Sequence, residues 1–180
     1  MVPRLEGEHI ISIKWIFRNK IDEEGNVIRN KAHPVAQGYS QMEGVDYDET
    51  FAPVARMESI RILLALAYHL KFKLYQINVK TAFLNGILKE DVYVTQPKGF
   101  IDPHFPDHML YLKKALYGLK HTLRDWYDRL TQYLVSHGFT RGKANQTLII
   151  KMEDRELIGS QVYVDDIIFR STKNELAIAF

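Results

Sequence analysis

Two neighbouring carboxylates, Asp165 and Asp166, lie between short runs of β-branched and aromatic residues. These flanks, residues 162–164 and 167–169, favour two β-strands joined by a hairpin turn at the acidic pair. Carboxylate oxygens are the ligands that Mg²⁺ prefers, and a pair of such ions can promote phosphoryl or nucleotidyl transfer. On these eight residues alone, a solvated hairpin turn carries about equal weight, because Asp is a common turn former.

The composition is that of a globular protein with one sizeable domain. The chain has 180 residues, a formal net charge of +2 and 46% hydrophobic residues, which suffices for a core. This charge is compatible with a local basic groove but does not prove a polyanionic partner. The absence of cysteine excludes a disulfide framework and a thiolate zinc site, and it fits an intracellular protein. No apolar run approaches the ~20 residues of a membrane span, so we expect no membrane partner.

The first half of the chain predicts a β-hairpin followed by a helix. Ile10 to Phe17 and Val27 to Ala36 have strand character, and the turn residues from Asp22 to Asn26 connect them. The basic residues on its arms are Lys14, Arg18, Lys20, Arg29 and Lys31. A loop around residues 46–53 precedes the helix, for which Ser59 is the expected N-cap. This helix should bury one face, formed by Ile60, Leu63, Leu64, Ala67 and Leu70.

The second half predicts further strands and a second helix. Strands are expected at Leu74 to Val79, Val92 to Val94 and Leu148 to Lys151, while residues 112–119 fit either a helix or irregular structure. The second helix has one apolar face and ends at Gly138; the face consists of Trp126, Leu130, Tyr133 and Leu134. A capping box at residues 172–175 opens a helix that is cut after about two turns, which predicts a piece of a longer protein.

Seven motifs, in order over almost the whole chain, together resemble the reverse transcriptase of Ty1/copia-type LTR retrotransposons, with a plant-like pattern. The motifs are Ile13-Lys14-Trp15-Ile16-Phe17, Ala36-Gln37-Gly38-Tyr39, Glu49-Thr50-Phe51-Ala52-Pro53-Val54-Ala55-Arg56, Ala82-Phe83-Leu84-Asn85-Gly86, Gln96-Pro97-Lys98-Gly99-Phe100, Lys114-Ala115-Leu116-Tyr117-Gly118-Leu119-Lys120 and Tyr163-Val164-Asp165-Asp166. The resemblance implies an α+β fold with reverse-transcriptase-like fingers and palm, a small antiparallel sheet backed by helices, and a missing thumb. The fingers-like parts would be about residues 10–56 and 88–122, and the palm-like parts about 57–87 and 123–180.

By this resemblance, Asp165 and Asp166 correspond to the metal-binding aspartates of the family's Tyr-x-Asp-Asp motif. The family's third metal-binding aspartate belongs at position 78, where this chain has Asn78. The family uses two Mg²⁺ ions, and Mn²⁺ is an alternative. An amide oxygen brings no charge and cannot bridge two ions as a carboxylate does. Losing a residue that merely supports a metal ligand typically costs ~10–100-fold, so we expect Mg²⁺-dependent polymerisation to be nearly absent.

The resemblance also assigns nucleotide and template positions. Phe83 matches the aromatic residue that rejects a ribose 2′-hydroxyl, although a core aromatic is otherwise the preferred interpretation. The turn that reaches the triphosphate corresponds to Lys80, Thr81 and Ala82, and Lys31 belongs to the fingers motif whose cations hold that triphosphate. The template and primer positions are Tyr117, Gly118, Lys120 and Tyr163. Without the resemblance, the lysines at 31, 80 and 120 would be interpreted as solvated surface charges.

Several other motif positions depart from the family pattern. His33 and Pro34 stand where the family usually has Arg-Leu, and residues 121–125 read His-Thr-Leu-Arg-Asp instead of Gln-Ala-Pro-Arg-Ala. Asn145 and Arg170 replace what are usually an aspartate and a glycine. Together with Asn78, these changes indicate a decaying copy of the element.

The implied partners are an RNA template, a DNA primer, deoxynucleoside triphosphates, and the integrase and ribonuclease H of the same Pol polyprotein, in a cytoplasmic particle. The alternative is a non-catalytic nucleic-acid-binding remnant without turnover, which would bind in a salt-sensitive, sequence-independent manner. A third hypothesis, an unfolded remnant, predicts the absence of cooperative unfolding. The acidic pair alone would also fit an unrelated two-carboxylate hydrolase, which the other motifs make remote.

Overall fold

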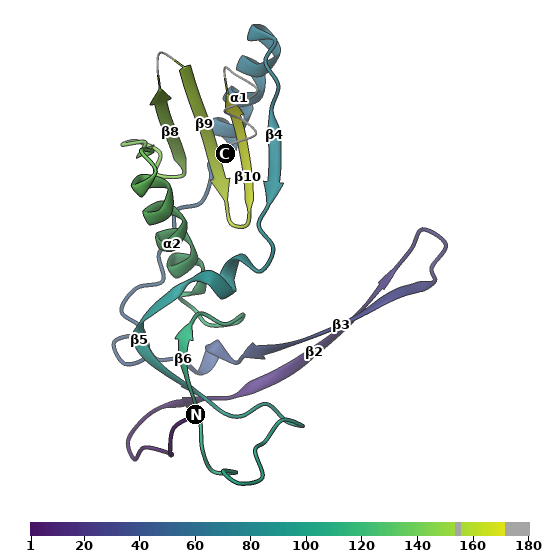
Figure 1. Ribbon diagram of the computed structural model, residues 1–180, viewed down its shortest axis with the longest axis vertical. Coiled ribbons are helices and arrows are strands. Elements are labelled where there is room, and N and C mark those ends of the chain that lie inside the picture. Colours follow the sequence, from purple (N-terminus) through teal and green to yellow (C-terminus); the bar gives the residue numbers. More distant parts are fainter. Residues whose placement is uncertain (154–155, 172–180) are drawn as a thin grey trace. The chain divides into compact units, whose positions relative to one another are not determined.

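The computed structural model describes residues 1–153 and 156–171, and the chain divides into two compact units (Figure 1). Unit 1 comprises residues 1–50 and 86–125, and unit 2 comprises residues 51–85 together with the described part of 126–180. The predicted capping box at residues 172–175 and the helix after it lie outside the described residues.

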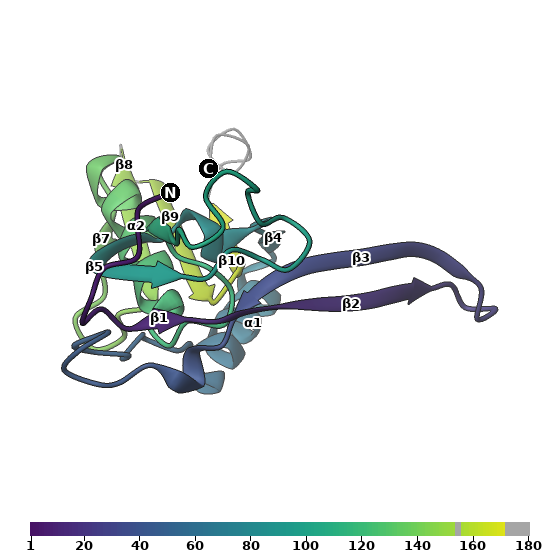
Figure 2. The ribbon, with the colours of Figure 1, turned by 90° about the horizontal axis from the view of Figure 1, so that it is seen from below.

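Unit 1 is built from two small β-sheets. Strands β2 (Ile13–Ile21) and β3 (Val27–Ala36) form the predicted basic hairpin and run side by side to their turn in Figure 2. The other sheet has the order β1-β5-β6. In it, β1 (Ile10–Ile11) runs parallel to β5 (Ile87–Val94), whereas β6 (Leu110–Lys114) is antiparallel to β5. The predicted first strand is therefore divided between the two sheets.

Local chemistry explains the hairpin of β2 and β3. At its turn, Asp22 Oδ1 accepts hydrogen bonds from the main-chain N–H groups of Glu24 at 3.0 Å and Asn26 at 2.8 Å. The hydrogen bond from the Asn26 main chain, opposed by burial, is the main reason why the pKa of Asp22 lies below its ordinary value. Pro34 lies opposite Trp15. A two-stranded sheet consists of edge strands, so the missing N–H of this proline is tolerated.

The core of unit 1 lies between the second sheet and the segments that flank it. Its buried side chains are Ile11, Ala36, Val92, Val94 and Leu119. The short 3-10 helix η1 (Gly38–Ser40) follows β3. Residues 112–119, which fitted either a helix or irregular structure, belong to the end of β6 and the irregular segment after it.

Unit 2 contains a five-stranded antiparallel sheet in the order β4-β10-β9-β8-β7. The strands are β4 (Tyr75–Asn78), β7 (Thr140–Arg141), β8 (Leu148–Glu153), β9 (Glu156–Tyr163) and β10 (Asp166–Ser171). The helices are α1 (Met57–Leu70), the 3-10 helix η2 (Ala82–Asn85) and α2 (Thr122–Ser136), which begins at the end of unit 1. The predicted α+β class and antiparallel sheet are confirmed.

Helix α2 provides much of the core of unit 2 and lies along the sheet in Figure 1. Leu130 and Leu134 join a cluster with sheet residues, among them Ile149, Val162 and Ile167. The helix ends two residues before Gly138, which has a φ of +85°. Gly138 therefore acts as the predicted terminator. Tyr133, which the sequence places on the same helical face, is exposed.

Helix α1 differs from its prediction at both its start and its face. Its N-cap is Arg56, not Ser59, and no side chain caps it. The Ser59 hydroxyl instead accepts a hydrogen bond from Asn145 Nδ2 at 2.8 Å, so a tertiary partner replaces the local cap. Leu64 is exposed, so the expected face is not buried as a whole. No helix within the described ranges is long and apolar enough to cross a membrane.

Candidate functional site

The acidic pair lies at a tight hairpin, as the sequence predicted. Val164 and Asp165 form the turn between β9 and β10, and Asp166 pairs with Tyr163 at the first position of the ladder. Val164 has a φ of +59°, which is strained for a β-branched residue. Two hydrogen bonds hold the turn in this conformation. The Trp126 indole Nε1 donates to the Val164 carbonyl at 2.7 Å, and the Val79 N–H donates to the Asp165 carbonyl at 2.8 Å.

Strand β4 brings Asn78 directly opposite Asp166, although 88 positions separate them in the chain. The Asn78 Nδ2 donates a hydrogen bond to Asp166 Oδ1 at 3.2 Å. A second carboxamide reaches the same oxygen, because Gln76 Nε2 donates to it at 3.3 Å. Asn78 is exposed, whereas Asp165 and Asp166 are half-buried. The carboxylate of Asp166 is thus held by two neutral donors from β4.

The residues present do not fit a pair of ions bridged by three carboxylates. Over residues 1–153 and 156–171, no group of three or more His, Cys, Asp or Glu side chains could hold a metal ion. Asp165 and Asp166 supply two carboxylates, but position 78 supplies an amide. To face a cation, the carboxamide of Asn78 would have to rotate and give up its hydrogen bond to Asp166, and it would still bring no charge.

The predicted nucleotide-binding residues of unit 2 follow β4 in one tight turn. Lys80 and Thr81 are exposed, Ala82 is buried and Phe83 is half-buried. Thr81 has a φ of +56°, and its carbonyl accepts hydrogen bonds from the Leu84 N–H and the Asn85 side chain. The chain passes directly from Asn78 into this turn. The turn and the acidic pair therefore lie near the same end of β4.

The remaining predicted positions lie in unit 1, except Tyr163, which is exposed at the end of β9. Lys31 is exposed on β3, opposite Arg18. Tyr117, Gly118 and Lys120 belong to the irregular segment after β6. The Lys120 ammonium donates to the Gln41 carbonyl at 3.0 Å and to the Tyr47 hydroxyl at 3.3 Å.

The β2–β3 hairpin segregates charge and aromatic side chains by strand face. Two like-charged pairs lie directly opposite each other, Arg18 with Lys31 and Lys20 with Arg29. Neither strand contains an acidic residue. Like charges in such register are destabilising unless an anion lies against them. On the alternate positions, Trp15 contacts Phe17 and Phe100, with ring centroids 6.3 and 5.5 Å apart, and both phenylalanines are highly exposed.

A buried polar cluster surrounds the start of α2 in unit 1. His121 and Asp125 are almost fully buried, with Nε2 and Oδ2 3.6 Å apart, and neither of these atoms has a hydrogen-bond partner. Burial raises the pKa of Asp125 to about 6, opposed by the neighbouring Arg124 guanidinium. Burial also lowers the pKa of His121. Arg124 forms an ion pair with Glu90 as well as with Asp125. Both buried groups are therefore shifted toward their neutral forms.

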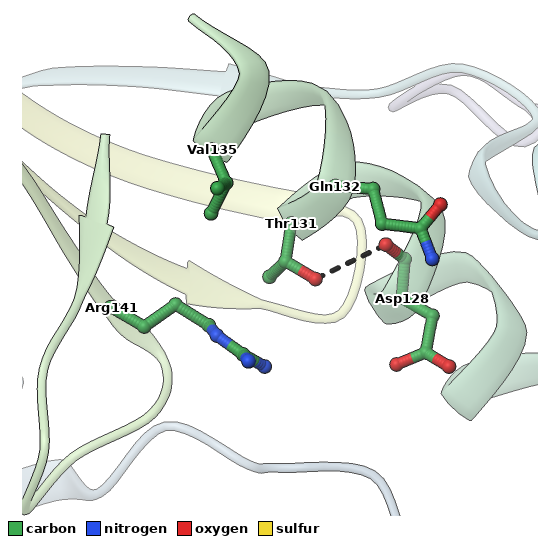
Figure 3. Close-up of a pocket in the computed structure, with 5 residues that line it drawn as sticks. All are labelled: Asp128, Thr131, Gln132, Val135 and Arg141. Carbon is green, nitrogen blue, oxygen red and sulfur yellow. Dashed lines mark hydrogen bonds between the residues drawn. The ribbon is translucent and has the colours of Figure 1, made fainter. Parts of the chain in front are cut away.

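Figure 3 shows a hollow of about 220 Å³ between α2 and β7. Its lining residues are Asp128, Thr131, Gln132, Val135 and Arg141. The dashed line in the figure marks the hydrogen bond from the Thr131 hydroxyl to the Asp128 carbonyl, at 3.1 Å. None of the residues that the sequence predicted for metal, nucleotide or template lines this hollow, so it is not part of the candidate site.

Comparison with known proteins identifies the family. The family model described as "Reverse transcriptase (RNA-dependent DNA polymerase)" matches residues 1–179. The chain belongs to this reverse transcriptase family. It is 43% identical, over 159 residues, to the Retrovirus-related Pol polyprotein from transposon RE2 of Arabidopsis thaliana, covering 88% of the chain. It is 36% identical, over 169 residues, to the corresponding polyprotein from transposon TNT 1-94 of Nicotiana tabacum, covering 93% of the chain.

The predicted resemblance to copia-type retrotransposon reverse transcriptases is confirmed by these matches. The chain spans only 11% of the length of the Arabidopsis polyprotein and 13% of the tobacco one. No solved structure matches the chain. Membership of a reverse transcriptase family implies use of divalent metal ions in general.

Some departures from the family pattern are accommodated in the structure. The Asn145 amide donates to Ser59, while its oxygen accepts hydrogen bonds from the Thr147 N–H at 3.1 Å and the Thr147 hydroxyl at 2.7 Å. The Arg170 guanidinium lies 4.0 Å from the centroid of the Phe72 ring. In contrast, Nδ1 of His33 is buried without a partner, as are both ring nitrogens of His121.

Sequence reasoning missed several residues that contact the predicted site positions, among them Gln76 and Gln41. Gln76 could have been found, because it lies two positions before Asn78 and so shares its strand face. Gln41 could not, because its side chain meets Lys120 across 79 positions of sequence.

Proposed function

We propose that the chain is the reverse transcriptase part of a retrotransposon Pol polyprotein, an RNA-directed DNA polymerase by descent that Asn78 impairs. The observation that carries this proposal is the hydrogen bond from Asn78 Nδ2 to Asp166 Oδ1, at the position directly opposite in the sheet. A carboxylate at position 78 would add a third negative ligand beside the acidic pair. The carboxamide instead brings no charge and donates a hydrogen bond to one carboxylate oxygen of Asp166.

The reaction in question is attack by a primer 3′-hydroxyl on the α-phosphorus of a deoxynucleoside triphosphate, with pyrophosphate as the leaving group. We assign Asp165 and Asp166 to metal binding and the turn at residues 80–83 to the nucleotide. Bound divalent ions would activate the hydroxyl and neutralise the pyrophosphate. The protein contributes the rigid presentation of the acidic pair, through the strained Val164 turn and its bond to Trp126.

We further assign unit 1 to the fingers and unit 2 to the palm. The boundaries expected from the sequence, at residues 56, 88 and 122, lie within six residues of the boundaries between the units, at 50, 86 and 125. The template and primer positions Tyr117, Gly118 and Lys120 then belong to the fingers, together with the nucleotide position Lys31. The metal positions, the other nucleotide positions and the template position Tyr163 belong to the palm.

Primer extension on an RNA template with deoxynucleotides tests the catalytic proposal. The chain is compared with its Asn78→Asp variant, in Mg²⁺ and separately in Mn²⁺. We expect extension only after the substitution, because it restores a charged ligand opposite Asp166. Extension by the unchanged chain at the rate of the variant would show that Asn78 does not impair the reaction.

Two controls isolate the position of the charge. Gln76→Glu adds the same negative charge to β4 two residues away, beside the same carboxylate, and should not restore extension. Asp166→Asn in the Asn78→Asp background should abolish any restored extension, which excludes a contaminating polymerase. Absence of extension from every variant would contradict the assignment of the defect to Asn78 alone.

The basic hairpin supports a second candidate function, which is nucleic-acid binding without turnover. Its arms carry five cations and no carboxylate, and two like-charged pairs lie opposite each other. Such an arrangement favours a polyanion, because bound phosphates relieve the repulsion. The expected partners are the RNA template and DNA primer. By family, the integrase and ribonuclease H of the polyprotein and a cytoplasmic particle complete the proposed context.

Binding of an RNA–DNA duplex, measured by fluorescence anisotropy over a range of salt concentrations, tests this second function. The logarithm of the affinity should fall linearly with the logarithm of the salt concentration. Substituting Lys31 by methionine should make the slope shallower by about one unit for each phosphate that the side chain no longer binds. Affinity that does not depend on salt would exclude the proposed electrostatic mode. Cooperative thermal unfolding of the same sample would exclude the unfolded-remnant hypothesis.

A further inference from the structure

Gln41, the residue that follows η1, contacts both ends of Lys120. It is 3% exposed. Its side-chain Oε1 accepts a hydrogen bond from the Lys120 main-chain N–H at 2.8 Å, and its main-chain carbonyl accepts one from the Lys120 ammonium at 3.0 Å. Both residues belong to unit 1. The buried side chain of Gln41 therefore holds the backbone of Lys120 in place, and the main-chain carbonyl of Gln41 holds the Lys120 ammonium in place.

Tyr47 completes the surroundings of this ammonium. The Lys120 Nζ donates to the Tyr47 hydroxyl at 3.3 Å and lies 5.2 Å from the centroid of the Tyr47 ring. An ammonium has three N–H donors, of which these contacts use two. Within the described ranges Lys120 forms no ion pair with a carboxylate, and the residue as a whole remains exposed. The cation is thus held in one orientation with a donor left over.

The backbones on either side of this contact touch directly, which leaves little freedom to rearrange. The Ala36 N–H donates to the Tyr117 carbonyl at 2.8 Å. A Cβ on Gly38 would overlap the carbonyl of Gly118, and a Cβ on Gly118 would lie 2.6 Å from Val35 Cγ1. Gly118 also has a φ of +94°. The segment that carries Lys120 is therefore held against the segment that carries Gln41.

The hydrogen bonding of Gln41 is incomplete. Its Nε2 is buried without a partner. An unpartnered buried donor destabilises the folded state. An apolar side chain of similar size would avoid this cost but would leave the Lys120 N–H without its acceptor. The fold thus keeps a carboxamide where its oxygen is needed.

We infer that Gln41 is a positioning residue, which orients the Lys120 ammonium to bind a phosphate of the nucleic-acid backbone. A lysine acts on a phosphate as a point charge with rotatable donors, so its own orientation must be set by its surroundings. Gln41 and Tyr47 set it here. This inference rests on the nucleic-acid binding proposed above. It adds Gln41 as the residue that orients the Lys120 ammonium for that binding.

Binding to an RNA–DNA duplex, measured by anisotropy over a range of salt concentrations, tests this in the full chain. Lys120→Met should make the slope of log affinity against log salt shallower by about 0.9, which corresponds to one phosphate. Gln41→Met should weaken binding by itself but have little effect in the Lys120→Met background, because it acts through Lys120. Additive effects of the two substitutions, or an unchanged slope in Lys120→Met, would overturn the inference.

Two further variants serve as controls for loss of folding and for duplex binding through other cations. Tyr47→Phe removes only the hydroxyl acceptor, so it tests the same coupling if Gln41→Met fails to unfold cooperatively. Lys31→Met reports on the hairpin cations independently. If Lys31→Met changes the slope and Lys120→Met does not, the duplex binds and the role of Gln41 is wrong. If the unchanged chain does not bind the duplex at all, the proposed binding function fails, and this inference fails with it.

Discussion

Above pH 6, unit 1 should be less stable with an ionised Asp125 than with a neutral asparagine at the same position. The side chain is 1% exposed at the start of α2, and burial raises its pKa from an ordinary value of 3.8 to about 6. A raised pKa means that the folded state favours the protonated form. The resulting stability is complete below pH 4 and is lost as the pH rises through 6. At pH 8 the folded protein carries a buried, ionised Asp125.

The size of this effect follows from the shift. About two pKa units, at 1.36 kcal/mol each, correspond to roughly 3 kcal/mol of free energy of unfolding. The substitution Asp125→Asn would keep an oxygen that accepts from Arg124, whose guanidinium also retains Glu90 as a partner. It should therefore stabilise the protein by on the order of 2–3 kcal/mol at pH 8. For a chain of this length that is a rise in Tm of roughly 4–12 °C.

Thermal unfolding of the two proteins at pH 8 and pH 4.5 checks this expectation. The rise in Tm should be clear at pH 8 and roughly a third as large at pH 4.5, where Asp125 is protonated in the folded state but largely ionised in the unfolded chain. Burial also lowers the pKa of His121, so protonation of this residue destabilises both proteins at low pH, and this contribution largely cancels in the comparison. Asp48→Asn removes the same charge from an exposed site and should have little effect at either pH.

Two results would refute this reasoning. An equal rise at both pH values would mean that the gain comes from packing and not from ionisation. A fall in Tm at pH 8 would mean that attraction between Asp125 and the Arg124 guanidinium outweighs the desolvation of the carboxylate.

Three further substitutions should give measurable changes in stability. Without divalent ions, Asn78→Asp should destabilise the sheet by on the order of 1 kcal/mol through repulsion screened by water, and Mn²⁺ should reverse the loss in a thermal shift assay with and without EDTA. Trp126→Phe should lower the free energy of unfolding in urea by about 1–3 kcal/mol, because the Val164 carbonyl loses its hydrogen-bond donor. Trp15→Phe is the control: its indole hydrogen bond is exposed, so the loss should be less than about 1 kcal/mol. Gly118→Ala should destabilise far more than Gly99→Ala in the same assay, since both have positive φ but only the first Cβ meets backbone atoms.

Local patterns in the sequence determined the elements that carry the site. Runs of β-branched and aromatic residues around Asp165 and Asp166 predicted a hairpin, and the turn residues from Asp22 to Asn26 predicted another; both are present. Gly138 predicted the end of α2. These signals are local because strand alternation, turn chemistry and helix termination each depend on a few adjacent residues. The departure at position 78 was also visible in the sequence.

The tertiary contacts that these elements make could not be predicted from local sequence patterns. Asn78 reaches Asp166, and Gln76 joins it, only because β4 pairs with β10 in one register out of many. Ser59 was expected to cap α1 but bonds Asn145 instead. Gln41 meets Lys120 across 79 positions. Only the position of Gln76, on the same strand face as Asn78, could be inferred locally. The other contacts have no local signature.

The sequence by itself thus determined which family this chain belongs to, and it shows that position 78 carries an amide. The tertiary structure decided what that amide does, which is to donate a hydrogen bond to the carboxylate of Asp166 opposite it. It also decided that His121 and Asp125 are buried together. The physical reason is that long-range strand register and burial are set by the packing of the whole unit, and no short segment of the chain contains that information.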